Sequence, residues 1–140
     1  MTCLLDTNVV AELTTRPKPA PAVIEWARSV PAPRHFLSVI TVAEIEAGVE
    51  ATSDPLRRAA LEHVLNGIRA EYQGRIAVIG EQEAAAYLAV HHRLKSSGTS
   101  IDPPDALIAA TAIANGWTLV SRNVKHLART GAAVLNPWEY

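Results

Sequence analysis

The sequence predicts an α/β fold in which a mainly parallel sheet is covered by helices on both faces. Short apolar segments alternate with helical patterns from one end of the chain to the other, as they do when helical crossovers join parallel strands. Hydrophobic residues make up 49% of the 140 residues, which is enough for a sizeable core. No linker, repeat or low-complexity tract interrupts the pattern. We therefore expect one domain over residues 1–140.

Five short segments are expected to form the strands. They are Cys3–Leu5, 36–40 (FLSVI), 75–80 (RIAVIG), 117–123 (WTLVSRN) and the start of 132–140 (AAVLNPWEY). Each is a short, largely apolar run, as expected for strands buried on both faces. In a sheet of parallel strands, all these segments end at the same edge.

Helical patterns fill the intervals between the strands. The expected helices cover 7–13, 22–30, 41–51, 53–68, 81–98, 102–116 and 124–130. The second presents Val23, Trp26 and Val30 on one face. The fourth has a proline in its first turn, and the fifth ends at a glycine, both of which are common helix boundary signals.

Charge and cysteine content narrow the class of protein. Thirteen basic and fourteen acidic residues give a formal charge of -1, which argues against a globally basic protein that coats nucleic acid but does not exclude a local basic rim. The single cysteine, Cys3, excludes an internal disulfide and favours a reducing compartment. Without a signal peptide or an apolar run near the roughly 18–20 residues of a membrane helix, we expect a soluble, cytoplasmic protein with no membrane contact.

Three acidic residues are expected at the carboxyl edge of the sheet, where α/β proteins bind their ligands. Asp6 follows the first strand directly. Glu44 is predicted in the first turn of the helix after the second strand, and Asp105 in the first turn of the helix before the fourth. The polar run 121–123 (SRN) leaves the fourth strand at the same edge.

Helix capping is the alternative explanation for each acid taken alone. Free N–H groups and the helix dipole favour a carboxylate at the N-terminus by roughly 0.3–1 kcal/mol. Asp6 can serve as an N-cap, and Thr41 with Glu44 matches a capping box. Asp102 can cap the helix that carries Asp105, with two prolines in its first turn, and for Asp102 we favour this role.

Several carboxylates at one edge repel one another unless a cation neutralises them. Mg²⁺ and Mn²⁺ bind carboxylate oxygens and keep several waters, which suits a phosphate substrate. Such an ion can polarise a phosphoryl oxygen, generate hydroxide and stabilise a leaving oxygen. The pattern of acids therefore predicts a metal-assisted hydrolase if the three side chains converge.

Four motifs in this order resemble those of PIN-domain proteins, and among these the VapC/FitB-type ribonuclease toxins of bacterial toxin–antitoxin pairs. The motifs are Asp6-Thr-Asn, Ser38-Val-Ile-Thr-Val-Ala-Glu44 with Gly48, Asp105-Ala-Leu-Ile-Ala-Ala-Thr-Ala, and Ser121-Arg-Asn. The likeness covers essentially the whole chain, including the closing Asn136-Pro-Trp138.

The resemblance implies a three-layer α/β/α sandwich acting as a Mg²⁺- or Mn²⁺-dependent endoribonuclease, the toxin of a type II toxin–antitoxin system. Asp6, Glu44 and Asp105 would surround the metal, and the substrate would be RNA. A cognate antitoxin would wrap the toxin and block its site. Homodimers and hetero-oligomers with the antitoxin are expected, and promoter DNA would be bound only through the antitoxin.

The chain departs from the family in the last motif. An acid often found there is replaced by Asn123 or, three residues later, by His126. The amide of Asn123 can still hold a metal-bound water or a phosphate. We expect Ser121 and Asn123, together with Thr7 and Asn8, to position water and phosphate. The departure leaves the number of metal ions open.

The motifs required by three other function classes are missing from this sequence. A receiver domain requires an aspartate after its third strand, where Gly80 and Glu81 stand, and a haloacid-dehalogenase-type phosphatase requires one in the place of Asn8. The glycine-rich lysine motif of a P-loop is absent. The open alternative is a catalytically weak or silent PIN domain acting as a protein-binding or regulatory module. Arg122 is equally interpretable as a substrate contact or as an ordinary loop arginine, and Glu12 lies outside the proposed set.

Overall fold

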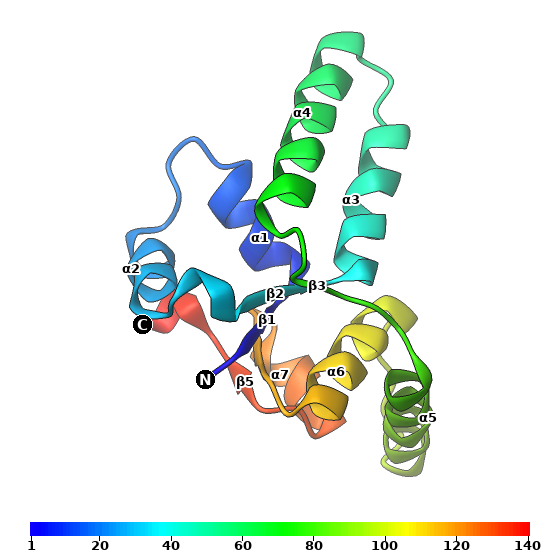
Figure 1. Cartoon of the computed structure of the whole chain (residues 1–140). Coiled ribbons are helices and arrows are strands. Elements are labelled where there is room, and N and C mark those ends of the chain that lie inside the picture. Colours follow the sequence, from blue (N-terminus) through cyan, green and yellow to red (C-terminus); the bar gives the residue numbers. More distant parts are fainter.

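Five parallel strands form one sheet in the order β3-β2-β1-β4-β5 (Figure 1). The computed structural model describes residues 1–140. Its strands are β1 (Cys3–Leu5), β2 (His35–Ser38), β3 (Ile76–Ala77), β4 (Thr118–Val120) and β5 (Val134–Leu135). The predicted α/β fold with a parallel sheet is confirmed, and the sheet is parallel throughout.

Seven α-helices surround this sheet. They are α1 (Thr7–Thr14), α2 (Pro21–Ser29), α3 (Val39–Glu50), α4 (Pro55–Glu71), α5 (Glu81–Ser96), α6 (Pro103–Asn115) and α7 (Val124–Leu127). Three short 3-10 helices complete the chain at η1 (Ala32–Arg34), η2 (Ala128–Thr130) and η3 (Pro137–Glu139). Crossing a bilayer would need a longer or more apolar helix than any that the chain forms.

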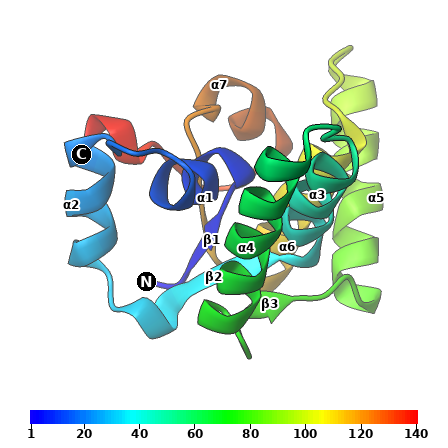
Figure 2. The ribbon, with the colours of Figure 1, turned by 90° about the horizontal axis from the view of Figure 1, so that it is seen from above.

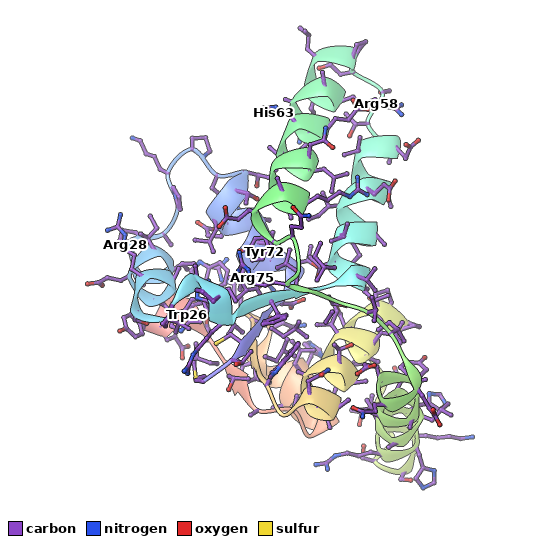
Figure 3. The ribbon with its side chains drawn as sticks, viewed as in Figure 1. Trp26, Arg28, Arg58, His63, Tyr72 and Arg75 are labelled. Carbon is purple, nitrogen blue, oxygen red and sulfur yellow. The ribbon has the colours of Figure 1, made fainter.

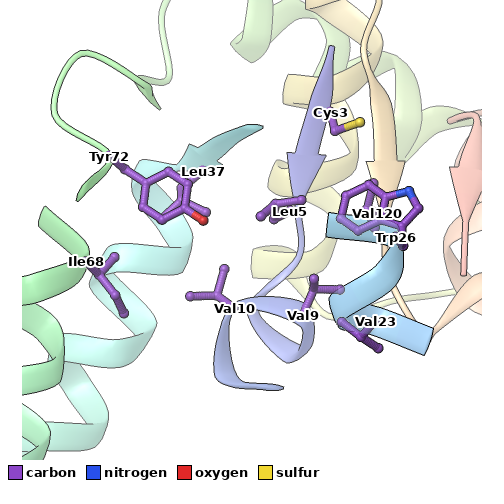
Figure 4. Packing of buried hydrophobic residues seen from close by; sticks show 10 residues of the cluster. All are labelled: Cys3, Leu5, Val9, Val10, Val23, Trp26, Leu37, Ile68, Tyr72 and Val120. Carbon is purple, nitrogen blue, oxygen red and sulfur yellow. The ribbon is translucent and has the colours of Figure 1, made fainter. Parts of the chain in front are cut away.

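Successive residues of the central strand point to opposite faces of the sheet and so belong to two cores. Leu5 joins residues of α1, α2 and α4 on one face, where Trp26 is the largest buried side chain (Figure 4). Leu4 packs with Ile108 of α6 and Leu127 of α7 on the other face. Helix α5 lies outside α6 and contacts it along Val90 and Leu94. This arrangement is the expected three-layer sandwich.

Helices α3 and α4 form an antiparallel pair that extends away from the sheet (Figure 1). Buried Val49 of α3 and Leu65 of α4 hold the pair together. At the base of α4, the guanidinium of Arg75 donates to the backbone oxygens of Ala32 and His35 over 2.7 and 2.8 Å and lies 4.7 Å above the ring of Tyr72 (Figure 3). The end of α4 is therefore fixed to the segment that enters β2.

The boundary between β2 and α3 differs from the prediction. The strand ends at Ser38, and α3 begins at Val39 with the Ser38 hydroxyl accepting the N–H of Ile40 over 3.0 Å. The expected cap at Thr41, and with it the capping box to Glu44, is wrong. An apolar run with β-branched residues fits a strand or a buried helix equally well, and here the serine cap decides the boundary. Glu44 consequently lies in the second turn of α3.

The register aligns the ends of the three strands that matter most for the site. Leu5 of β1 stands opposite Leu37 of β2 and Val120 of β4. The next residue, Asp6, donates its backbone N–H to the carbonyl of Val120 over 2.9 Å. The carboxyl ends of β1, β2 and β4 therefore meet at one edge, as the parallel arrangement predicted. Helix α3 packs against both α1 and α6 beside this edge (Figure 2).

Candidate functional site

Asp6 is the most constrained side chain at this edge, with 6% of its surface exposed. One carboxylate oxygen, Oδ1, accepts the backbone N–H of Thr7 over 2.9 Å and so caps α1. The other, Oδ2, accepts the hydroxyl of Ser121 over 2.6 Å and the amide of Asn8 over 3.3 Å. Asp6 is thus both a helix cap and a fixed carboxylate at the ligand edge, so the two interpretations from the sequence are compatible.

Ser121 connects the end of β4 to this carboxylate. Its side chain is fully buried, and its oxygen also accepts the backbone N–H of Asn123 over 3.0 Å and the amide of Asn8 over 3.2 Å. The oxygen of the Asn8 amide in turn accepts the backbone N–H of Arg122 over 3.3 Å. The loop after β4 and the first turn of α1 therefore hold Asp6 in one orientation.

Thr7 links Asp6 to the second predicted acid, Glu44. The Thr7 hydroxyl donates to Oε1 of Glu44 over 2.8 Å, while its backbone N–H binds Asp6. The hydroxyl of buried Thr41 lies 3.1 Å from that of Thr7. Glu44 itself is exposed at the surface of α3, which leaves its other oxygen accessible to a ligand.

Asp105 is the third predicted acid and lies half-buried in the first turn of α6. Burial raises the pKa of its carboxyl, and the negative charges of Asp6, Glu44 and Asp102 raise this pKa further. The nearby charge of His126 acts in the opposite direction. Since this coupling requires proximity, the structure brings the acids of three distant motifs into one electrostatic cluster.

A pocket of about 240 Å³ opens beside Asp105. It is lined by Ser100, Ile101, Asp102, Asp105, Asn123 and His126. Asp102 occupies the N-cap position as predicted, but its side chain makes no capping hydrogen bond. The carboxylate of Asp102 therefore adds negative charge to this pocket, and His126 lines the same pocket.

The acids lie close together without forming a ready-made ion cage. No three His, Cys, Asp or Glu side chains are grouped closely enough to hold a metal ion as they stand. The carboxylate, amide and hydroxyl oxygens of the edge are nevertheless the donors preferred by hard cations. A partly hydrated divalent cation fits such a donor set, because it needs only one or two protein carboxylates. It would also neutralise the repulsion that, after burial, contributes to the raised pKa of Asp105.

Two other acids near these motifs have separate roles. Glu12 is 8% exposed and its carboxylate accepts the N–H of Ala20 over 2.8 Å, where α2 begins. Glu46 pairs with Arg69 of α4 at 3.3 Å, on the far side of α3 from Glu44 in the helical repeat. Both carboxylates therefore have partners other than the three predicted acids.

Sequence reasoning did not foresee the environment of Arg122. Its guanidinium lies 4.4 Å above the ring of Trp138 in the C-terminal η3. The carboxamide of Asn136 holds this short helix by accepting the N–H of Trp138 over 3.0 Å. The closing Asn-Pro-Trp sequence belonged to the predicted family likeness, but nothing in it identified Arg122 as the partner of the tryptophan.

Comparisons with known proteins agree with this geometry. The family model described as "PIN domain" matches residues 3–132. The VapC ribonuclease Y4jK of Sinorhizobium fredii is 33% identical over 137 residues, which cover 97% of each chain. Toxin FitB of Neisseria gonorrhoeae is 35% identical over 136 residues, covering 96% of this chain and 97% of FitB.

Solved structures show the same relationship. The crystal structure of FitAcB from Neisseria gonorrhoeae superposes with a TM-score of 0.90 at 34% identity, covering 99% of this chain and 100% of the matched chain. The structure of FitAB bound to an IR36 DNA fragment gives a TM-score of 0.88 at 35% identity, with 98% and 96% covered. The resemblance to VapC/FitB-type PIN proteins is confirmed, and the chain belongs to the PIN domain family.

Proposed function

We propose that the chain is a metal-dependent endoribonuclease that hydrolyses RNA phosphodiester bonds as the toxin of a type II toxin–antitoxin system. The observation that carries the proposal is the hydrogen-bonded set of Ser121, Asp6, Thr7 and Glu44 at the carboxyl edge of the sheet. The charges of Asp6 and Glu44 add to the raised pKa of Asp105 beside them. Full-length relatives named as a ribonuclease and as a toxin support the choice of activity.

Asp6, Glu44 and Asp105 would hold Mg²⁺, or Mn²⁺ in its place. When bound, such an ion supplies polarisation of the phosphoryl oxygen and an acidified water. The protein's own contribution is orientation: Ser121 and Asn8 fix the carboxylate of Asp6, and Thr7 fixes that of Glu44.

In the proposed reaction, a water oxygen bonds to phosphorus while the bond from phosphorus to the 3′ oxygen breaks. The attacking water loses a proton and the departing 3′ oxygen gains one, so the reaction is a hydrolysis without a redox step. Asn123 lines the pocket beside Asp105, where its side-chain amide can donate to a phosphate oxygen. Donors such as this amide would align the attacking and leaving oxygens, and this alignment would supply much of the rate enhancement.

The proposed partners are a cognate antitoxin protein and a second copy of the chain. Two solved structures that resemble this chain are described as FitAcB from Neisseria gonorrhoeae and as FitAB bound to an IR36 DNA fragment. By analogy, the toxin would form a homodimer and a hetero-oligomer with its antitoxin, and promoter DNA would be contacted only through the antitoxin.

The test is cleavage of RNA by the purified chain with Mg²⁺, with Mn²⁺ and with a chelator. We expect cleavage that needs the ion and that falls by about 100-fold or more when Asp6→Asn removes one of the charges that stabilises the metal. Equal cleavage by the wild type and this variant would reject Asp6 as a ligand. Absence of cleavage with every ion, alongside intact antitoxin binding, would instead favour the silent regulatory module.

A further inference from the structure

A second cavity, of about 310 Å³, lies between α5 and the start of α6. The ring of Tyr87 and the side chains of Leu94, Ile101 and Ala106 supply its apolar lining. Its volume falls in the range of small-ligand sites, which are concave, largely apolar and supplied with a few polar groups. The cavity is therefore large enough for one flat ring system.

The cavity adjoins the acidic pocket. Ser100 and Ile101 line both of them, so this short loop forms their common wall. The loop is well anchored, because the N–H of Thr99 donates to the carbonyl of Leu94 over 2.9 Å and the hydroxyls of Ser97 and Thr99 lie 2.6 Å apart. A ligand seated beside Asp105 thus has a preformed neighbouring site for its next group.

The two adjoining pockets differ in charge. The acidic pocket contains Asp102 and Asp105, whereas no carboxylate lines the second cavity. Lys95 and His91 stand at its wall, and Lys95 takes part in none of the chain's five ion pairs. The second cavity therefore combines an aromatic and apolar interior with an unpaired cation at the rim, which suits a ring attached to an anionic group.

We propose that this cavity binds the base of the RNA nucleotide next to the cleaved phosphate. The base stacks on Tyr87, and Lys95 contacts a flanking backbone phosphate. The inference rests on the proposed ribonuclease function and adds a recognition site to it. Single-stranded RNA suits the arrangement, since unstacked bases bind aromatic side chains while the backbone follows basic groups.

The first experiment measures RNA binding without cleavage. The full-length Asp105→Asn protein is titrated with fluorescent single-stranded hexamers of A, C, G or U, and anisotropy gives the Kd. Adding Tyr87→Ala should weaken binding by about tenfold, the effect of one stacking contact. Tyr87→Phe should restore it, because the ring is retained. Lys95→Ala should weaken binding to all four hexamers. It should also lower the salt dependence of the Kd by about one phosphate contact.

The control is a substitution of His92, which neighbours His91 in the sequence. His91 lines the cavity, whereas His92, which is also exposed on the same helix, does not. The proposal expects His92→Ala to leave the Kd unchanged. Because Tyr87 also packs against the core of α5 and α6, thermal unfolding is recorded for each variant, while exposed Lys95 provides a test that does not depend on this packing.

The second experiment uses an RNA that the wild type cleaves and copies carrying a single abasic ribose at each position near the cut. Removing the base at one position should slow cleavage by the wild type but should not slow cleavage by Tyr87→Ala. Equal losses at every position would overturn the base site while leaving the nuclease intact. Absence of cleavage by the wild type would instead defeat the proposed function. If Tyr87→Ala changes only the mass in sedimentation, the cavity is an interface between copies and the proposal is wrong.

Discussion

The hydroxyl of Ser121 donates a 2.6 Å hydrogen bond to the carboxylate of Asp6 across 115 positions of sequence. Both side chains are buried, and the bond joins the carboxyl ends of two neighbouring parallel strands. A buried carboxylate that loses such a donor is left poorly solvated. The bond should therefore matter for stability and for the orientation of the proposed metal ligand.

Ser121→Ala tests this relationship. We expect a loss of about 1–3 kcal/mol in the free energy of unfolding, because Asp6 loses a buried donor. We also expect RNA cleavage to fall at least tenfold. Thr130→Val is the matched control, since Thr130 is another buried hydroxyl that binds only the backbone of residues 127 and 132. If the control reduces cleavage equally, Ser121 acts only through general stability.

The raised pKa of Asp105 predicts how stability depends on pH. A carboxyl whose pKa is higher in the folded than in the unfolded protein binds more protons when folded, so its ionisation opposes folding. In the presence of a chelator, the stability of the wild type relative to Asp105→Asn should rise as the pH falls from neutral through the raised pKa. Urea unfolding at several pH values measures this difference. A difference independent of pH would contradict the raised pKa of Asp105.

Added Mn²⁺ should stabilise the folded chain. An ion that binds only the native state adds about 2.7 kcal/mol at one hundred times its Kd, which raises the Tm by several degrees. Glu44→Gln should reduce this gain because it removes a proposed ligand. Glu46→Gln should preserve it, since Glu46 pairs with Arg69 elsewhere on the surface. Identical Tm values with and without Mn²⁺ would count against a metal site at this edge.

Trp138 should influence RNA binding through Arg122. Stacking of a guanidinium on an indole contributes about 0.5–2 kcal/mol and restricts the arginine to one direction. Arg122→Ala and Trp138→Ala should each weaken RNA binding, and the double variant should lose less than the sum of the two. Anisotropy titrations of all three provide the cycle. Strictly additive losses would show that the two side chains act independently.

The sequence predicted the start of the site well. The apolar run Cys3–Leu5 followed by Asp6 specifies a buried strand that ends in a helix cap, and both features are present. The second acid was placed less accurately, because Val39 and Ile40 suit a strand as well as a helix. The early start of α3 moves Glu44 one turn further along the helix than expected.

Contacts that depend on strand order could not be predicted from the sequence pattern. Local periodicity gives the strands but not their neighbours, so it could not show that β1 lies between β2 and β4 or that Ser121 therefore meets Asp6. The stacking of Arg122 on Trp138 depends in the same way on where the C-terminal residues pack. The positions of Asp6 and Asp105 in the fold could be predicted, whereas the hydrogen bonds that hold Asp6 and Glu44 in place required the folded chain.

The central position of β1 has a consequence for the order in which the acidic edge can form. Strand β1 ends at Leu5 and pairs on one side with β4, which ends only at Val120. Asp6 therefore acquires its Ser121 donor only after the 115 positions that follow it have been translated. A nascent chain stalled before Ser121 therefore lacks the completed acidic edge.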